Sequence, residues 1–220
     1  MDFQSIVGQE GTIKYLIQSI QANRVGHAYI FDGQEGSGKK TIAHVFAKAV
    51  LCQQFQSDVC GKCPACLKVD SKNHPDLKFI EREKLHIVDE QIEAMQQDLS
   101  LRPYESHRKI YIIDDANTMT DRAQNRLLKT LEEPPQYGLI ILLSTNVYRF
   151  LSTIRSRCQI IKLNRLPFAQ IEEYLKQFHQ VSPGEARILA AFSDGFLGKA
   201  MRLKESQEFQ SKRENVIKLI

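Results

Sequence analysis

The sequence predicts an α/β protein with a parallel, doubly wound sheet, followed by a small all-helical domain. Short apolar runs alternate with helical patterns through the first part of the chain, as in folds built from βαβ units. One apolar run passes through a glycine-rich turn into a helix, which is the local pattern of a phosphate-binding loop. After Leu166-Pro167 only helical periodicity continues. We therefore expect one domain at 1–165 and a second at 166–220.

Each element of the first domain follows from its own pattern. Apolar side chains at three- and four-residue spacing predict helices at 13–20, 42–50, 89–99 and 122–131, and Pro134-Pro135 ends the last of these. Short apolar runs predict strands at 28–31, 77–80, 109–113, 139–143 and 159–163. The run at 139–143 has no polar residue, as expected for a strand that is covered on both faces.

The second domain is predicted to be helical throughout. An apolar stripe at 171–178 indicates one helix. A capping box at 182–185, with proline at the first helical position, opens another helix. The tail at 204–220 is charged and compatible with a helix.

Composition excludes several classes of protein. The chain has 220 residues, of which 42% are hydrophobic and 25% charged, enough apolar residues for a real core. A net charge of +4 excludes an acidic disordered chain and is too small to indicate a nucleic-acid binder by itself. No apolar run approaches the ~18 residues of a membrane span, and the N-terminus lacks the pattern of a signal peptide. We expect a cytoplasmic protein with no membrane contact.

The glycine-rich turn GQEGSGKKT matches the spacing G-x-x-x-x-G-K of a phosphate loop. Its glycines let backbone N–H groups face phosphate oxygens, and Lys39 would reach the β- and γ-phosphates. The next residue is normally Ser or Thr, whose hydroxyl binds Mg²⁺. Here it is Lys40, which cannot ligate a metal, and Thr41 comes one position too late. Binding of ATP or ADP stays open, as does a simple glycine turn with solvated lysines. The candidates are Gly33, Gly36, Gly38, Lys39, Lys40 and Thr41.

An apolar strand pattern, IYII, ends in two acids, Asp114 and Asp115, and so matches the Walker B motif. Asp114 occupies the position linked to Mg²⁺. Asp115 stands where a glutamate normally orients the attacking water, and it is one methylene shorter, so a water held by it would be misplaced. The alternative is a strand end whose acids cap the following helix.

Four cysteines, Cys52, Cys60, Cys63 and Cys66, fall within fifteen residues. Without an export signal, disulfides are not expected and a metal site is favoured. Four thiolates at this spacing suit tetrahedral Zn²⁺ in a structural module at about 52–66, and no ligand position is left open for catalysis. A redox pair is the alternative for one C-x₂-C unit. Cys158 is expected to be a buried apolar residue.

The phosphate loop, the Walker B strand, the run RLLKTLEEPP at 126–135 and the triplet SRC at 156–158 together resemble the AAA+ clamp-loader subunits of bacterial DNA polymerase III. The resemblance covers about 7–203. It implies an arginine finger at Arg157 that enters a neighbouring subunit's ATP site, and a γ-phosphate sensor at Thr145. It also implies a zinc module at the cysteines and a C-terminal collar domain beyond Ile220. In the segment GFLGKA, ATPase subunits carry arginine where this chain has Gly198.

Three positions needed for ATP hydrolysis are therefore altered, namely Lys40, Asp115 and Gly198, whereas Arg157 is intact. This asymmetry resembles the delta-prime type of subunit, which stimulates a neighbour's ATPase without an active site of its own. The resemblance implies a role in DNA replication within a DNA-directed DNA polymerase (nucleotidyltransferase) holoenzyme. The partners would be gamma/tau and delta subunits, with the sliding clamp and primed DNA reached through the complex. The alternatives are a gamma/tau-type ATPase, an unrelated zinc-containing AAA+ ATPase and a non-catalytic scaffold.

Overall fold

The computed structural model describes residues 1–207 and 209. The chain divides into two compact units. The first, the sheet unit, contains Met1–Ile6, Glu10–Gly33 and Lys39–Leu163. The second, the helical unit, contains Val7–Gln9, Gln34–Gly38 and the chain from Asn164 on. The middle of the glycine-rich loop thus belongs to the helical unit, although both of its flanks belong to the sheet unit.

The sheet unit contains a five-stranded sheet in which every neighbouring pair is parallel. The order is β2-β3-β4-β1-β5, so the neighbours β4 and β1 come from distant parts of the sequence. The predicted α/β class with a parallel sheet is confirmed, and each predicted strand is present within one residue at either end. The strands are β1 (Ala28–Asp32), β2 (Leu77–Ile80), β3 (Lys109–Ile113), β4 (Gly138–Ser144) and β5 (Gln159–Lys162).

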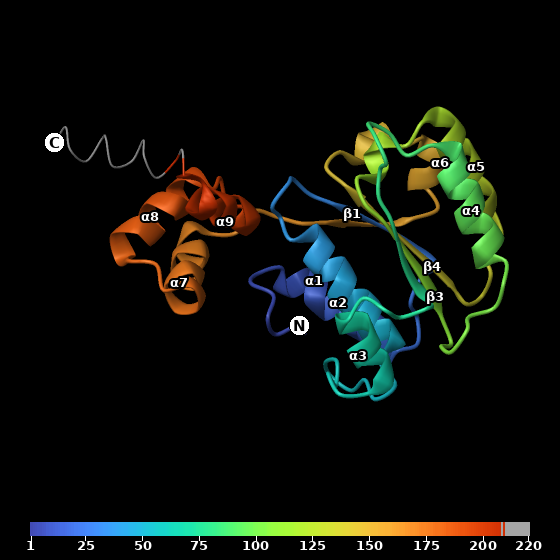
Figure 1. Ribbon diagram of the computed structural model, residues 1–220, viewed down its shortest axis with the longest axis horizontal. Helices are drawn as coiled ribbons and strands as arrows, with labels where there is room; N and C mark the ends of the chain where they lie inside the picture. Colours follow the sequence, from blue (N-terminus) through green and yellow to red (C-terminus); the bar gives the residue numbers. More distant parts are fainter. Residues whose placement is uncertain (208, 210–220) are drawn as a thin grey trace. The chain divides into compact units, whose positions relative to one another are not determined.

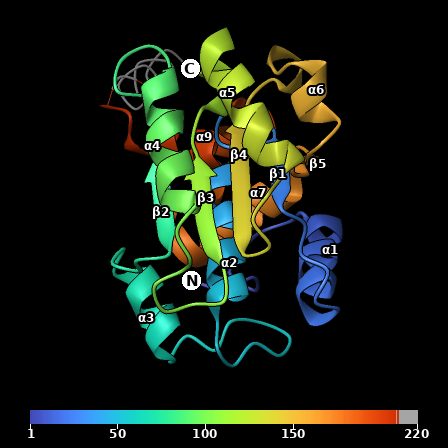
Figure 2. The ribbon, with the colours of Figure 1, turned by 90° about the vertical axis from the view of Figure 1, so that its right-hand side faces the viewer.

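Helices cover both faces of the sheet, as Figure 2 shows. On one face lie α1 (Glu10–Gln21), α2 (Lys39–Leu51) and α3 (Pro64–Asp70), packed on a core that includes Tyr29 and Phe31. On the other lie α4 (Asp89–Leu99), α5 (Asp121–Glu132) and α6 (Ser152–Arg155), packed on a core that includes Ile30. Adjacent strand residues point to opposite faces, and therefore β1 contributes to both cores. Two 3₁₀ turns, η1 (Ala116–Thr118) and η2 (Val147–Arg149), complete the unit.

The helix α3 was not predicted, because it is too short to show periodicity. Its start is nevertheless defined by its sequence: the Cys63 side chain caps it by accepting from the backbone N–H of Cys66, and Pro64 occupies the first helical position. Ala65, Cys66 and Val69 are buried in the core of the sheet unit and hold the helix in place. Tertiary burial, rather than helical propensity, explains this element.

The helical unit contains α7 (Phe168–His179), α8 (Pro183–Phe192) and α9 (Leu197–Glu205), seen in Figure 1. Its own core includes Ile171, Leu175 and Leu189. The predicted cap of α8 is present, since the Ser182 hydroxyl accepts from the backbone N–H of Glu185 at 3.4 Å. Of the predicted helical tail, residues 208 and 210–220 lie outside the described part of the chain. Among the residues that are described, no helix is long and apolar enough to cross a membrane.

Candidate functional site

The carboxyl ends of the central strands carry the predicted nucleotide-site residues of the sheet unit. Asp32 of β1 pairs with Ser144 of β4, and the backbone N–H of Gly33 donates to the Ser144 carbonyl at 3.0 Å. Asp114 directly follows β3, which pairs with β4 in parallel. Because these strands are parallel, Gly33, Asp114 and Thr145 come to the same edge of the sheet, where ligands bind in open α/β folds.

Two lysines begin helix α2, and their ammonium groups have different partners. The Lys39 side chain is largely buried, and its Nζ donates to the carbonyl of Gly33 at 2.6 Å. The Lys40 Nζ lies 2.6 Å from Asp114 Oδ2 and 3.9 Å from Glu81 Oε1. The hydrogen bond and the charge of Asp114 raise the pKa of Lys40, so this side chain is a cation at neutral pH. The carboxylate expected to face Mg²⁺ is therefore already paired.

The second acid of the Walker B pattern has an unusual backbone. Asp115 adopts the left-handed conformation (φ 47°), and its carbonyl accepts from the N–H and the hydroxyl of Thr118, both at 2.8 Å. Its carboxylate lies 3.6 Å from Arg82 Nε and makes no capping hydrogen bond to η1. Thr145, after β4, donates its backbone N–H to Asn117 Oδ1 at 3.1 Å. The neighbours Glu81 and Arg82 belong to no motif, and sequence reasoning missed them.

Within the helical unit, the backbone of Gly36 in the phosphate loop contacts the start of α9. Gly36 (φ 82°) and Gly38 (φ 88°) both have the left-handed backbone that the loop requires. The N–H of Gly198 donates to the Gly36 carbonyl at 2.9 Å. A Cβ on Gly198 would lie 2.7 Å from the Gly36 Cα, so no side chain fits there, least of all arginine. The neighbouring Lys199 forms an ion pair with Asp194.

A pocket of about 560 Å³ adjoins this contact, and its charges cancel in pairs. Glu35 pairs with Arg202, just as Asp194 pairs with Lys199. Both cations that line the pocket, Lys199 and Arg202, are therefore paired with a carboxylate. The lining residues are Gln34, Glu35, Asp194, Phe196, Lys199, Arg202, Leu203 and Ser206.

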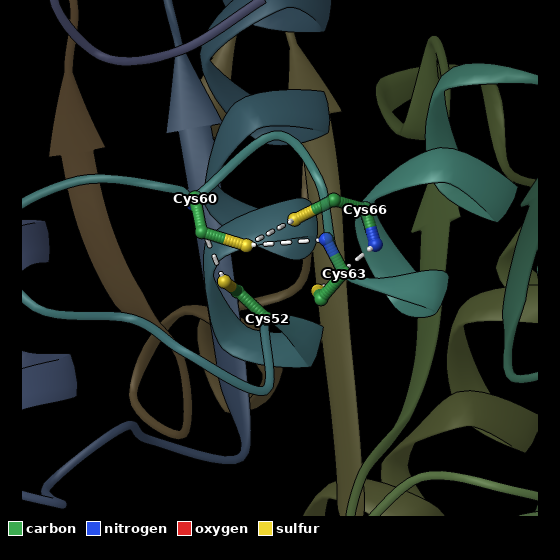
Figure 3. A group of neighbouring side chains, drawn as sticks. All are labelled: Cys52, Cys60, Cys63 and Cys66. Carbon is green, nitrogen blue, oxygen red and sulfur yellow. Dashed lines mark hydrogen bonds between the residues drawn. The ribbon is translucent and has the colours of Figure 1, made fainter.

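The four clustered cysteines converge, as Figure 3 shows. Cys52 follows α2, Cys60 lies in the next loop, and Cys63 and Cys66 belong to the start of α3. Their four Sγ atoms all lie within 4.8 Å of one another, and those of Cys60 and Cys66 are 3.9 Å apart. Ligands ~2.3 Å from a tetrahedral Zn²⁺ are about 3.8 Å apart. None of the four is in a disulfide, so they could hold a metal ion.

Backbone groups around the cluster favour the thiolate form of Cys60. The Cys60 sulfur accepts from the N–H of Cys63 at 3.3 Å, and hydrogen bonds from Lys62 and Cys63 lower the pKa of the Cys60 thiol to about 6. Burial raises the pKa of the Cys52 and Cys66 thiols. A metal ion among the sulfurs would offset that desolvation and stabilise the thiolates.

Two further residues that can bind metals, Cys158 and His74, lie outside this cluster. Cys158 is buried in the core beside α5 and α6, and burial raises the pKa of its thiol to about 12, as suits an apolar role. His74 is also buried, and its Nδ1 accepts from the backbone N–H of Asp76 at 3.2 Å. Its Nε2 lies 3.3 Å from the Ser106 hydroxyl, so the ring joins two loops.

The predicted finger, Arg157, lies just after α6 with its side chain about one third exposed. Its Nη2 is 2.9 Å from Glu132 Oε1, and its Nη1 donates to the Thr153 carbonyl at 2.9 Å. Glu132 ends α5 inside the RLLKTLEEPP run. Sequence reasoning noticed that run but missed the ion pair, because no spacing rule links residues this far apart.

Comparison with known proteins places the chain. Residues 8–167 match the family described as DNA polymerase III, delta subunit. The chain belongs to this family. It is 39% identical over 211 residues to DNA polymerase III subunit delta' of Bacillus subtilis, covering 96% of the chain and 64% of that relative. It is 34% identical over 207 residues to subunit tau of the same organism, covering 91% of the chain and 37% of the relative. The chain thus spans less than two thirds of either relative.

Solved structures show the same fold. A gamma-subunit-related protein of Thermotoga maritima superposes with a TM-score of 0.60 at 22% identity, covering 87% of this chain and 57% of that one. The RuvB Holliday junction branch migration motor of Thermotoga maritima gives 0.62 at 19% identity, covering 90% and 61%. At these identities the likeness concerns the fold alone, which is the predicted α/β architecture with a parallel sheet followed by helices.

Proposed function

We propose that this chain is a delta-prime-type subunit of the DNA polymerase III clamp loader. In this role it supplies an arginine finger to a neighbouring ATP site and hydrolyses no ATP itself. The observation that carries the proposal is the ion pair between Lys40 and Asp114, because it closes the chain's own metal position while Arg157 stays at the surface. Family membership and the identity to a delta' subunit over nearly the whole chain support it.

Arg157 has the chemistry of a trans-acting finger. Its guanidinium is permanently charged, planar and able to donate two parallel hydrogen bonds to phosphoryl oxygens. In the isolated chain it pairs with Glu132, whose side chain is half exposed, so little free energy opposes its transfer to a neighbour. The partners in this proposal are gamma/tau and delta subunits. Together they open the sliding clamp and place it on primed DNA.

The cysteine cluster has a structural part in the proposal. Cys52, Cys60, Cys63 and Cys66 hold one Zn²⁺, which joins the end of α2 to the start of α3. All four ligand positions come from the protein, so the ion is closed to substrate and takes no part in catalysis.

A reconstituted clamp loader tests the finger role. The complex is assembled from gamma/tau, delta and one of four chains: the wild type, R157A, R157K or the surface control R24A. Both ATP hydrolysis and clamp loading are then measured with clamp and primed DNA. An arginine finger contributes ~10³–10⁵ in rate at its own site. We therefore expect R157A to lower clamp loading by at least ~10-fold, with no rescue by R157K, because lysine lacks the planar fork.

A surface variant and a check of assembly show whether a loss of activity is specific to Arg157. R24A should load clamps like the wild type, since Arg24 is exposed and belongs to none of the motifs. Gel filtration before the assay shows whether each variant enters the complex. If R157A assembles and loads clamps at the wild-type rate, the finger role is wrong.

A further inference from the structure

The fold family implies a Mg²⁺ ion between the residue after the phosphate-loop lysine and the first Walker B aspartate. In this chain those positions are Lys40 and Asp114. The Lys40 Nζ lies 2.6 Å from Asp114 Oδ2, close to the shortest separation that a charge-assisted hydrogen bond reaches. The side chain that would have supplied a hydroxyl ligand therefore contributes a positive charge at the same place.

Mg²⁺ does not fit this arrangement. The ion requires oxygen ligands at ~2.0–2.1 Å in near-octahedral geometry. An ammonium in contact with the same carboxylate oxygen occupies that space, and it also repels a divalent cation. It provides three donors and no acceptor, so it cannot enter the coordination shell.

The carboxylate needs a cation, which makes Lys40 more than an accidental surface charge. The Asp114 side chain is only 14% exposed, whereas that of Lys40 is 67% exposed. Lys40 therefore reaches in from solvent to a largely buried acid. A second carboxylate, Glu81, lies 3.9 Å from the same ammonium. Without Lys40, both acids would lie at this edge of the sheet with no counter-ion from that position.

We propose that Lys40 is a built-in replacement for the divalent cation, so that any nucleotide polyphosphate taken by this site is bound without metal. The inference rests on the proposed function, and it adds a reason for the missing hydrolysis: the metal position is filled, not merely lacking one ligand. It follows that a single substitution, K40T, reopens the position. The shorter side chain would restore a hydroxyl on α2 and leave Asp114 in need of a cation.

A Mn²⁺ titration followed by NMR tests this on the full chain without nucleotide or partners. Mn²⁺ broadens amide signals near its binding site, so the midpoint at which the Asp114 amide broadens reports the local affinity. We expect the wild-type midpoint to match that of an exposed acid elsewhere on the sheet unit, such as Glu133. In K40T it should fall at least ~10-fold, because losing one unit charge a few ångströms away exceeds the ~1.4 kcal/mol that corresponds to this factor.

Two matched variants make the result specific. K84T removes an exposed lysine from the nearby loop and should leave the midpoint at Asp114 unchanged. D114N combined with K40T should abolish the gain, since Mn²⁺ then lacks its carboxylate. Equal midpoints in K40T and wild type would overturn the proposal, and so would preferential broadening of Asp114 in the wild type. The second result needs no variant and therefore decides the matter even if K40T folds poorly.

A second titration, with a fluorescent ADP analogue, tests whether nucleotide binds to this site without a metal ion. Wild-type affinity should be equal in Mg²⁺ and in EDTA, whereas K40T should bind at least ~10-fold more tightly with Mg²⁺. Tighter wild-type binding in Mg²⁺, or no binding at all, would overturn this part of the proposal. Neither outcome would contradict the proposed clamp-loader role, which the R157A assay tests separately.

Discussion

The sheet unit holds two motifs that bind cations in other proteins, and they differ in completeness. At the cysteine cluster every ligand is present, and the four sulfurs converge to distances suited to one ion. At the Walker B strand the metal ligand from α2 is replaced, and the substituting Lys40 pairs with Asp114. Where all ligands are present in the sequence, as at the cysteines, their convergence in the fold can be predicted. Where one ligand is replaced, as at position 40, the sequence shows which ligand is missing. Only the structure shows that the Lys40 ammonium pairs with Asp114 instead.

The largest expected effect is at the complete site. C60S removes one of four metal ligands, and structural Zn²⁺ contributes ~10–16 kcal/mol of apparent binding free energy in small modules. We expect loss of bound zinc and a fall of several kcal/mol in the free energy of unfolding, measured by urea denaturation and metal analysis. C158A, outside the cluster, should keep its zinc and cost only ~1 kcal/mol. Full zinc content in C60S would contradict the four-ligand site.

The second effect concerns two glycines of the phosphate loop, which differ in how closely they are packed. Gly36 and Gly38 share a left-handed backbone, but only Gly36 is crowded, since its Cβ would lie 2.7 Å from the Lys199 nitrogen. We expect G36A to lower the free energy of unfolding by ~3 kcal/mol and G38A by ~1 kcal/mol, without any nucleotide. Thermal unfolding measures both. Equal effects would show that the contact between the loop and α9 contributes nothing.

A smaller effect depends on pH. Burial lowers the pKa of His74, so the folded ring takes up a proton at a lower pH than the ring in the unfolded chain, which titrates near pH ~6.5. Below that pH the unfolded state binds more protons, and the contribution of His74 to stability is lost as the pH falls. H74N keeps an acceptor for the Asp76 N–H. Relative to wild type, H74N should gain stability as the pH falls from 7 to 5, which chemical denaturation measures. A difference that does not change with pH would contradict this.

Much of the fold was predictable because its signals are local. The strands 77–80 and 109–113 and the helix 89–99 have the predicted bounds, since each is a continuous or periodic apolar pattern between clear breaks. The convergence of the cysteines was predictable for the same reason, because their spacing is short. Helix α3 was missed, as it depends on a cysteine cap and on burial rather than on periodicity.

The charges around the candidate sites were not predictable, because they join residues distant in sequence. The pairs Lys40–Asp114 and Arg157–Glu132 each connect different elements of the sheet unit. The sequence showed that Lys40 cannot bind a metal, but not that its ammonium reaches the Walker B carboxylate. Likewise, the glycine at 198 indicated a missing arginine, whereas the structure shows a close backbone contact with Gly36. Such pairings follow from strand order and helix placement, which no local pattern encodes.

We propose that this chain acts on a neighbour's ATP site and has no working site of its own. ATP hydrolysis by the purified chain, alone and in the presence of Mg²⁺, tests it most directly. We predict no release of phosphate above that of buffer, because Lys40 holds the metal position and Asp115 is too short to place the attacking water. Sustained turnover that depends on Mg²⁺ and disappears in D114N would contradict this proposal and assign the chain to the ATPase subunits.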